Sequence, residues 1–367
     1  MSKVIISTES SWMAKEALQS GEVLRAQLEN SANLNEWVAQ LRAAPPNVFI
    51  TVARGSSDHA AGFWSYLLMQ RLGILTVSLP LSLVTLHRSP LRVPNTVAVG
   101  LSQSGASPDL VETLRYLQQA GAYAVACVNQ VDSPMAECAD RVLPVLAGQE
   151  RSVAATKSCL GMMTLAAQWV ALWTEDQALL DGLHDLAEVM SNAVDSAEYD
   201  GYAQALAILA EQQRVLIIGR GLLYSVASES ALKMKETCAI QSEPFSVAEV
   251  RHGPMRLIED EYPLVVFITP GQEQAQLVQF CLEMRQRGAQ LVVFSVLGAE
   301  TVKTLREAGC VVINTPLDAC RFPESVCSVT APLVVLQRFY LFVARLSQAR
   351  GLDPGRPLFL NKVTQTR

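Results

Sequence analysis

Residues 53–74 read ARGSSDHAAGFWSYLLMQRLGI, and residues 219–240 read GRGLLYSVASESALKMKETCAI. The two stretches have equal length, share an Arg-Gly pair near the start and end in an isoleucine. Each follows a run of apolar residues and continues into a helical pattern, so each predicts a strand, a tight turn and a helix. This correspondence indicates that one structural unit occurs twice in the chain.

Further apolar runs predict the other strands of this repeated unit. Continuous apolar runs that alternate with amphipathic helices are typical of parallel sheets covered on both faces. The predicted strands are 47–53, 96–102 and 122–128 in the first half, and 214–220, 263–269 and 289–295 in the second. We therefore expect an α/β fold made of two tandem, doubly wound parallel-sheet domains.

The domain boundaries follow from the same patterns. Residues 172–210 have helical periodicity and contain no Pro or Gly-Ser stretch, so packed helices rather than a flexible tether join the halves. We expect an N-terminal helical segment (1–28), a first domain (29–175), a helical connection (176–200), a second domain (201–346) and a C-terminal tail (347–367).

Composition narrows the class of protein. The 367 residues are 50% hydrophobic and 17% charged, with a net charge of −6. Such a chain has no basic field for nucleic acid, although backbone amides can still bind a small anion. The N-terminus lacks a signal-peptide pattern, and Gln337 and Arg338 interrupt the apolar stretch APLVVLQRFYLFVARL. We expect a cytoplasmic protein with no membrane span, and a core helix in that stretch.

The eight cysteines include no C-x-x-C pair. Several lie in apolar runs such as AVACV and GCVVI, so we expect free, buried thiols and no metal site. Nucleotide cofactors are poorly supported as well, because GRG at 219–221 lacks the third glycine of a dinucleotide fingerprint and the chain has no phosphate-binding P-loop motif. We expect no cofactor.

The segment GLSQSGASPDLVETL (100–114) is a candidate phosphate site. A predicted strand ends near Leu101, a hydroxyl-rich loop follows, and Ser107-Pro108 resembles an N-cap followed by the first helical residue. Hydroxyls and amides at a helix start suit a phosphomonoester. An ordinary serine-rich turn would have the same pattern. A similar polar turn, with Ser56 and Ser57, follows the strand at 47–53.

The helix 225–237 places three charged side chains on one face. Glu229, Lys233 and Glu236 are spaced i, i+4 and i+7, after a buried strand and at the ligand end of the sheet. A carboxylate in this position could move a proton between adjacent sugar carbons, whereas the alternative is a solvated ion-pair stripe. His252, in the loop EVRHGPM, is an acid–base candidate, although a lone histidine is more often structural.

Five motifs together make a family resemblance specific. LSQSGASPD, SVAATKS, ESALKMKE, AEVRHGP and PLFLNKVT follow one another over nearly the whole chain. In this order they resemble the sugar isomerase (SIS) family, in particular the isomerase part of glucosamine-6-phosphate synthase. The resemblance implies two flavodoxin-like SIS domains, a sugar-phosphate ligand and a homodimer with shared active sites.

The resemblance also implies roles for individual residues. It assigns proton transfer to Glu236, its support to Lys233, ring opening in the partner subunit's site to His252, and a Schiff base with a ketose to Lys362. It assigns phosphate binding to the serine-rich loop and further hydroxyls to the first turn; these residues are Ser102, Gln103, Ser104, Ser107, Ser56 and Ser57.

Two positions depart from the synthase pattern. Val153-Ala154-Ala155 has alanine where the synthase has a serine at the third position, and Asn361 replaces an alanine. Val153, Ala155 and Asn361 would lie near the amino-bearing end of the sugar, so the identity of the sugar is open. The chain begins Met1-Ser2-Lys3, and we expect it to lack the glutaminase domain of the synthase.

These features favour an isomerising deaminase that converts glucosamine 6-phosphate into fructose 6-phosphate and ammonia. The alternatives among enzymes are a phosphosugar aldose–ketose isomerase and a deglycase for a sugar-amine phosphate. A phosphosugar-sensing binding module is the alternative from another class. A transcriptional sensor would need a helix-turn-helix unit with a basic face, and residues 1–46 show neither.

Overall fold

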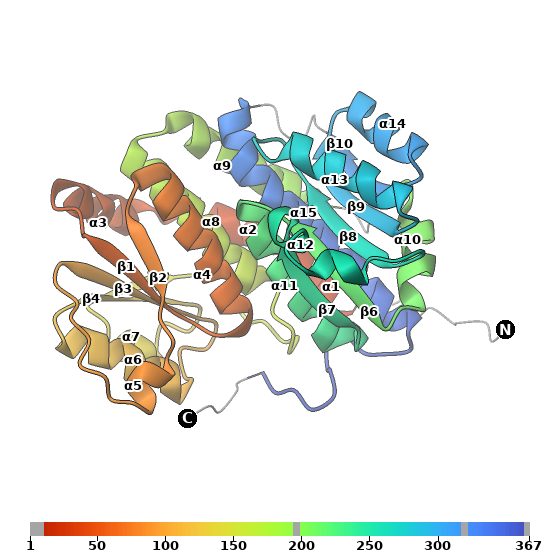
Figure 1. The fold of residues 1–367 in the computed structure, drawn as a ribbon. Coiled ribbons are helices and arrows are strands. Elements are labelled where there is room, and N and C mark those ends of the chain that lie inside the picture. Colours follow the sequence, from red (N-terminus) through yellow and green to blue (C-terminus); the bar gives the residue numbers. More distant parts are fainter. Residues whose placement is uncertain (1–10, 194–198, 317–321, 363–367) are drawn as a thin grey trace. The chain divides into compact units, whose positions relative to one another are not determined.

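The computed structural model describes residues 11–193, 199–316 and 322–362. These residues form two compact units, each built around one five-stranded parallel sheet (Figure 1). The β1–β5 unit contains the described residues of the ranges 20–150, 157–187 and 361–367. The β6–β10 unit contains those of the ranges 1–19, 151–156 and 188–360.

The two sheets have the same topology. Their strand orders are β2-β1-β3-β4-β5 and β10-β9-β8-β6-β7, which are equivalent when the second is reversed. The strands are β1 (Val48–Val52), β2 (Leu75–Ser78), β3 (Thr96–Ser102), β4 (Tyr123–Val128), β5 (Arg141–Pro144), β6 (Arg214–Gly219), β7 (Gln241–Ser246), β8 (Pro263–Ile268), β9 (Gln290–Leu297) and β10 (Val311–Pro316). The shared order confirms the predicted fold class and the duplication.

Helices cover both faces of the sheet in the β1–β5 unit. Those that start in this unit are α2 (Ser20–Glu29), α3 (Ala32–Ala43), α4 (Gly55–Leu67), α5 (Ser82–Thr85), α6 (Pro108–Gln119), α7 (Pro134–Glu137), α8 (Lys157–Thr174), α9 (Gln177–Ser191) and a π-helical turn, η1 (Leu68–Leu72). Side chains of β1 alternate between the two faces: Phe49 packs edge-on against Trp169 of α8, whereas Ile50 joins the cluster that contains Leu110 and Leu114 of α6.

The β6–β10 unit repeats this arrangement. Its helices are α1 (Trp12–Leu18), α10 (Tyr202–Ala210), α11 (Leu222–Cys238), α12 (Val247–Val250), α13 (Gln274–Gln286), α14 (Ala299–Glu307), α15 (Glu324–Ala349) and the 3₁₀ turn η3 (Pro254–Leu257). Figure 1 shows α13 beside β8 and β9 in this unit. Phe339 of α15 packs against Phe267 of β8 and Phe294 of β9, so α15 covers the sheet with apolar side chains.

α15 is the predicted core helix. Among the described residues, it alone is long and apolar enough to cross a membrane, but 94% of its most apolar window is buried. Gln337 lies within it and donates to the carbonyl oxygens of Ala17 and Met190, both at 3.0 Å. The helix therefore packs as a core element with internal polar contacts.

Most cysteines match the sequence prediction. Six of the seven that the structure describes are free, and burial raises the pKa of Cys127 to about 12. Cys327 is disulfide-bonded, so the expectation of a free thiol is wrong there; Cys320 lies outside the described residues. The spacing of cysteines in the sequence did not predict this disulfide, because disulfide formation depends on the distance between two cysteines in the folded chain.

All six predicted strands form, and four further strands lie at the sheet edges. β2, β5, β7 and β10 occupy the ends of the two strand orders. β2 and β7 are largely exposed or half-buried, and β7 contains Pro244. Edge strands tolerate polar residues and proline, so β2 and β7 lack the continuous apolar runs from which the central strands were predicted.

Candidate active site

A serine-rich turn joins β3 to α6 in the β1–β5 unit. β3 ends at Ser102, Ser107 is the N-cap residue and Pro108 is the first residue of α6, as predicted. Ser102 is buried, whereas Gln103 and Ser104 are half-buried. The four predicted ligands Ser102, Gln103, Ser104 and Ser107 therefore lie in one short turn at the start of a helix.

Two hydroxyls of this turn bind its own backbone. The Ser102 hydroxyl accepts a hydrogen bond from the N–H of Gly105 at 3.0 Å, and the Ser104 hydroxyl accepts one from the N–H of Ala106 at 3.3 Å. Because a hydroxyl also has a proton, each can accept these bonds and donate to a ligand. The turn thus combines fixed hydroxyls with the positive end of the α6 dipole, which suits an anion.

Gly105 fixes the shape of the turn. Its φ of +62° lies in the left-handed region, and a β-carbon at this position would overlap Ser133 Oγ. Its carbonyl oxygen accepts a hydrogen bond from the N–H of Met135 at 3.0 Å. Glycine is therefore required by conformation and by space.

The second predicted turn lies at the neighbouring strand. Ser56 and Ser57 are half-buried in the first turn of α4, directly after β1. β1 pairs with β3 in parallel, with Val52 opposite Gly100, so both polar turns leave the same edge of the sheet. The two serine turns that the sequence predicted therefore lie at the ends of adjacent strands.

Asp58 is the titratable group with a shifted pKa in this region. Burial raises the pKa of its carboxyl, although the charges of His59 and Arg54 and a hydrogen bond from Ser78 act in the opposite direction. The negative form is thereby disfavoured relative to an exposed aspartate.

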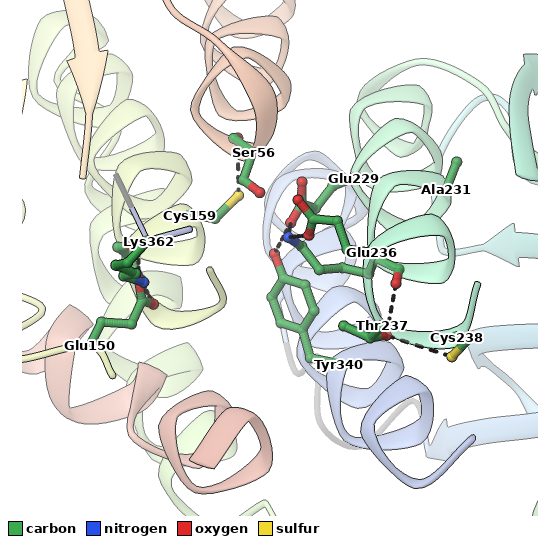
Figure 2. A network of polar contacts seen from close by, with 12 residues as sticks. Ser56, Glu150, Cys159, Glu229, Ala231, Glu236, Thr237, Cys238, Tyr340 and Lys362 are labelled. Carbon is green, nitrogen blue, oxygen red and sulfur yellow. Dashed lines mark hydrogen bonds and ion pairs between the residues drawn. The ribbon is translucent and has the colours of Figure 1, made fainter. Parts of the chain in front are cut away.

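Lys362 is held by a buried glutamate in the same unit (Figure 2). Its Nζ lies 2.8 Å from Oε2 of Glu150, whose side chain is completely buried, while a quarter of the Lys362 side chain is exposed. Glu150 also accepts hydrogen bonds from the N–H and the hydroxyl of Ser158, at 3.1 and 2.7 Å. Asn361, the preceding residue, is exposed.

The β6–β10 unit contains the predicted charged face of α11 (Figure 2). The Nζ of Lys233 lies 2.5 Å from Oε2 of Glu236 and 3.5 Å from Oε1 of Glu229. Lys233 and Glu229 are completely buried, whereas 22% of the Glu236 side chain is exposed. A solvated ion-pair stripe is therefore excluded, because a stripe of that kind would be exposed.

Tyr340 of α15 completes this cluster. Its hydroxyl donates to Oε1 of Glu229 at 2.9 Å, so the buried carboxylate has two partners. A buried charge is retained in proteins when pairing and hydrogen bonds offset its desolvation. The cluster leaves Glu236 as the member with access to a ligand.

His252 is not part of this cluster. It is exposed in the turn between α12 and η3, where its backbone N–H donates to the carbonyl oxygen of Glu249 at 2.9 Å. Within the described residues, no side chain forms a hydrogen bond with its imidazole. A role in the partner subunit's site stays a prediction.

Val153 and Ala155 lie in a loop that Glu16 of α1 anchors. The buried Glu16 carboxylate accepts from the N–H of Arg151 at 2.5 Å and from the N–H of Ser152 at 3.1 Å. The N–H of Val153 donates to the carbonyl oxygen of Gly355 at 3.1 Å. Val153 and Ala155 are half-buried, and their role at the sugar stays a prediction.

Each unit therefore assembles a separate set of candidate residues. The β1–β5 unit contains the two serine turns, Asn361 and Lys362; the β6–β10 unit contains Lys233, Glu236, His252 and the loop with Val153 and Ala155. Sequence reasoning missed the partners that hold these residues, namely Glu150, Glu16 and Tyr340. The contacts of Glu150 with Lys362, of Glu16 with Arg151 and of Tyr340 with Glu229 each join residues that are distant in sequence, so no local motif could identify them.

The chain matches the SIS domain family twice, over residues 44–172 and 208–337. It is 32% identical over 311 residues to the isomerizing glutamine–fructose-6-phosphate aminotransferase of Methanothermobacter thermautotrophicus. That alignment covers 85% of this chain and 50% of the relative. The chain spans about half the length of the curated relatives that it matches.

Two crystal structures are similar over nearly the whole chain. One is a protein provisionally named a phosphosugar isomerase, from Silicibacter pomeroyi DSS-3; it is 30% identical, has a TM-score of 0.80, and the match covers 94% of this chain and 100% of that one. The other is a glucosamine-6-phosphate deaminase from Thermotoga maritima, with 19% identity, a TM-score of 0.70 and coverage of 97% and 100%. The second likeness is one of fold alone.

Proposed function

Because this chain belongs to the SIS domain family, with two copies of the domain, we propose that it is an isomerising deaminase of glucosamine 6-phosphate. The products are fructose 6-phosphate and ammonia. The main supporting observation is Glu236, a partly exposed carboxylate held at 2.5 Å by the completely buried Lys233. A carboxylate fixed in this way can accept and return a proton without leaving its position.

Substrate binding is the role of the β1–β5 unit. The hydroxyls of Ser102, Ser104 and Ser107 donate to the phosphate at the start of α6, and the turn with Ser56 and Ser57 contributes further donors. These contacts do not change during the reaction, so they contribute to binding of substrate and transition state alike.

Proton transfer is the role of the β6–β10 unit. His252 of the partner subunit assists ring opening, which gives the open-chain aldehyde. Glu236 removes the proton from C2 and returns it to C1, while the amine nitrogen loses one proton and the C1 oxygen gains one. The aldehyde thereby becomes an alcohol and the C2 amine becomes an imine. The Lys233 ammonium holds the Glu236 carboxylate in position before Glu236 accepts this proton and again after Glu236 has returned it.

Hydrolysis of the imine completes the reaction. Water adds to C2, the C2–N bond breaks and ammonia leaves, so that the ketone of fructose 6-phosphate remains. No electrons are gained or lost overall, because C1 is reduced as C2 is oxidised. Dilute free ammonia favours this direction by mass action.

Lys362 acts as a carbonyl-orienting cation. Its contact with Glu150 at 2.8 Å is the contact of an ammonium with a carboxylate. An ammonium can donate to a carbonyl oxygen but has no lone pair for attack. Formation of a Schiff base would require Lys362 to leave Glu150 and lose a proton.

An aldose–ketose isomerase of phosphosugars is the second candidate. The similar Silicibacter pomeroyi protein, provisionally named a phosphosugar isomerase, favours it. Ala155 and Asn361, which differ from the synthase pattern, allow a different substituent at C2. A deglycase for amine adducts of fructose 6-phosphate would use the same proton transfer.

Substrate profiling separates these activities. The purified protein is incubated with glucosamine 6-phosphate, without added metal, nucleotide or glutamine, and both ammonia and fructose 6-phosphate are measured. We expect the two products in equal amounts. Parallel incubations use glucose 6-phosphate and an amine adduct of fructose 6-phosphate. If only an unaminated sugar phosphate is converted, the isomerase replaces the deaminase; release of an intact larger amine identifies the deglycase.

A further inference from the structure

Arg54 directly precedes the serine turn at the start of α4 in the β1–β5 unit. It follows β1 and is the N-cap residue of α4, with an extended backbone at φ −143° and ψ 154°. Its side chain is 58% exposed, and its Nε donates to Oδ2 of Asp109 at 3.2 Å. Asp109 belongs to the first turn of α6, so this bond links the two turns directly.

The carboxylate of Asp109 holds the side chain of this arginine in place. Its side chain is only 2% exposed, and its Oδ1 accepts a hydrogen bond from the N–H of Leu110 at 2.9 Å. One oxygen is therefore occupied by α6 and the other by Arg54. A buried carboxylate held in this way fixes the orientation of the guanidinium.

The bond to Asp109 uses only the Nε of Arg54. Within the described residues, neither Nη group forms a hydrogen bond. The two Nη groups together have four protons in the plane of the guanidinium, a geometry that matches phosphate oxygens. The exposed part of the side chain thus retains most of its hydrogen-bonding capacity.

The serine turn lacks a cation of its own. Its side-chain donors, Ser102, Ser104 and Ser107, are neutral, whereas a phosphomonoester has nearly two negative charges at neutral pH. Arg54 is tied to the same turn through Asp109, two residues after Ser107. Its charge can therefore offset that of the phosphate at short range.

We propose that Arg54 is a phosphate-binding residue, oriented by Asp109 through Nε so that its Nη groups bind the phosphate of the substrate. This inference rests on the phosphosugar binding of the proposed function, and it specifies a substrate with a doubly charged phosphate. Asp109 is a positioning residue, because it acts through Arg54. The repeated Arg-Gly pair is visible in the sequence, but the contact with Asp109 is not.

Equilibrium binding tests this proposal without turnover. Isothermal titration of the purified protein uses inorganic phosphate, fructose 6-phosphate and fructose as probes. We expect Arg54→Gln to weaken binding of fructose 6-phosphate tenfold or more, and Arg54→Lys to weaken it less. Asp109→Asn should weaken it severalfold, although Arg54 is still present. Weak binding of fructose should stay the same in all variants.

Arg88→Gln is the matched control, because Arg88 is also an exposed arginine of this unit, paired with Glu112. It should bind fructose 6-phosphate as the wild type does. The proposal fails if Arg54→Gln binds within twofold of wild type, even if its melting temperature falls, because Arg54 then only neutralises Asp109. It also fails if the wild type binds neither phosphate nor fructose 6-phosphate.

The same variants distinguish this inference from the proposed reaction. If Arg54→Gln weakens phosphate binding but the wild type releases no ammonia, the phosphate role stands and the deaminase proposal fails. If the wild type releases ammonia and Arg54→Gln has an unchanged KM, the reaction stands and the role of Arg54 fails.

Discussion

The two copies of the strand-turn-helix unit differ most in where their polar residues lie. When residues 53–74 are aligned with 219–240, Ser56 and Ser57 correspond to Leu222 and Leu223. The serines are half-buried at the start of α4, whereas both leucines are buried at the start of α11. At these two positions, therefore, only the first copy offers hydroxyls.

The helices that follow show the opposite difference. Glu229 and Lys233 of α11 correspond to Phe63 and Leu67 of α4, and all four side chains are completely buried. The first copy thus uses an apolar pair where the second uses an ion pair. Burial of an ion pair is offset only when geometry and further hydrogen bonds are good, so it indicates a role other than packing.

This comparison shows how one backbone can serve two purposes. We infer that the first copy binds the phosphate with a polar turn on an apolar helix, while the second moves protons with a charged helix behind an apolar turn. The two copies share one strand order and differ in the polarity of a few equivalent positions.

The largest effect is expected at Glu236. Replacement with glutamine preserves the shape of the side chain but removes the proton acceptor, so kcat should fall by about 10²–10⁴-fold. Steady-state ammonia release measures this change. Glu243→Gln, at an exposed carboxylate of β7, is the control and should have wild-type activity. Undiminished deamination by Glu236→Gln would reject the assigned base.

The second-largest effect is expected on the free energy of unfolding, when the buried ammonium of Lys233 is removed. Lys233→Met leaves the buried Glu229 without its cation, and breaking a buried pair in this way costs about 3–5 kcal/mol of unfolding free energy. Urea unfolding measures the change. Lys235→Met, at an exposed lysine of the same helix, should have little effect. Equal stability of the two variants would mean that the ion pair does not hold the cluster together.

Substitutions in the serine-rich turn between β3 and α6 should have smaller effects, and these effects should be on KM. Ser102→Ala, Ser104→Ala and Ser107→Ala each remove one hydroxyl donor to a charged group, which corresponds to an increase in KM of about tenfold or more. Changes in kcat should be smaller, because this binding is uniform. Ser31→Ala, at a serine with no side-chain capping bond, is the control. If KM were unchanged in all three variants, the turn would only cap α6 and would not bind the phosphate.

The smallest expected effect is a partial recovery of activity when two inactive variants are mixed. This experiment tests the assignment of His252. If His252 serves the partner subunit's site, a mixture of inactive His252→Ala and Glu236→Ala subunits forms hybrid dimers with one intact site. Random exchange should restore about a quarter of wild-type activity. Light scattering checks the assembly. A fully active monomer, or hybrids without activity, would contradict a shared site.

The sequence predicted the parts of the fold that depend on local pattern. The central strands are continuous apolar runs, and the charged face of α11 follows from helical spacing. The edge strand β2 was missed because its residues are mostly exposed and form no apolar run.

The partners in the site could not be predicted in the same way. Glu150 and Lys362 are 212 residues apart, and Tyr340 and Glu229 are 111 apart. Such pairs depend on how the fold brings distant elements together, which no local pattern specifies. The sequence pattern also could not predict that Lys233 is buried, because its burial depends on the packing of α11 against α15.

The most direct test of the division between the two copies is equilibrium binding of fructose 6-phosphate to Glu236→Gln and Ser104→Ala. We expect Glu236→Gln to bind this sugar phosphate within a few-fold of wild type, whereas Ser104→Ala should bind it about tenfold or more weakly. If Glu236→Gln lost binding while Ser104→Ala retained it, binding and proton transfer would not be divided between the two copies.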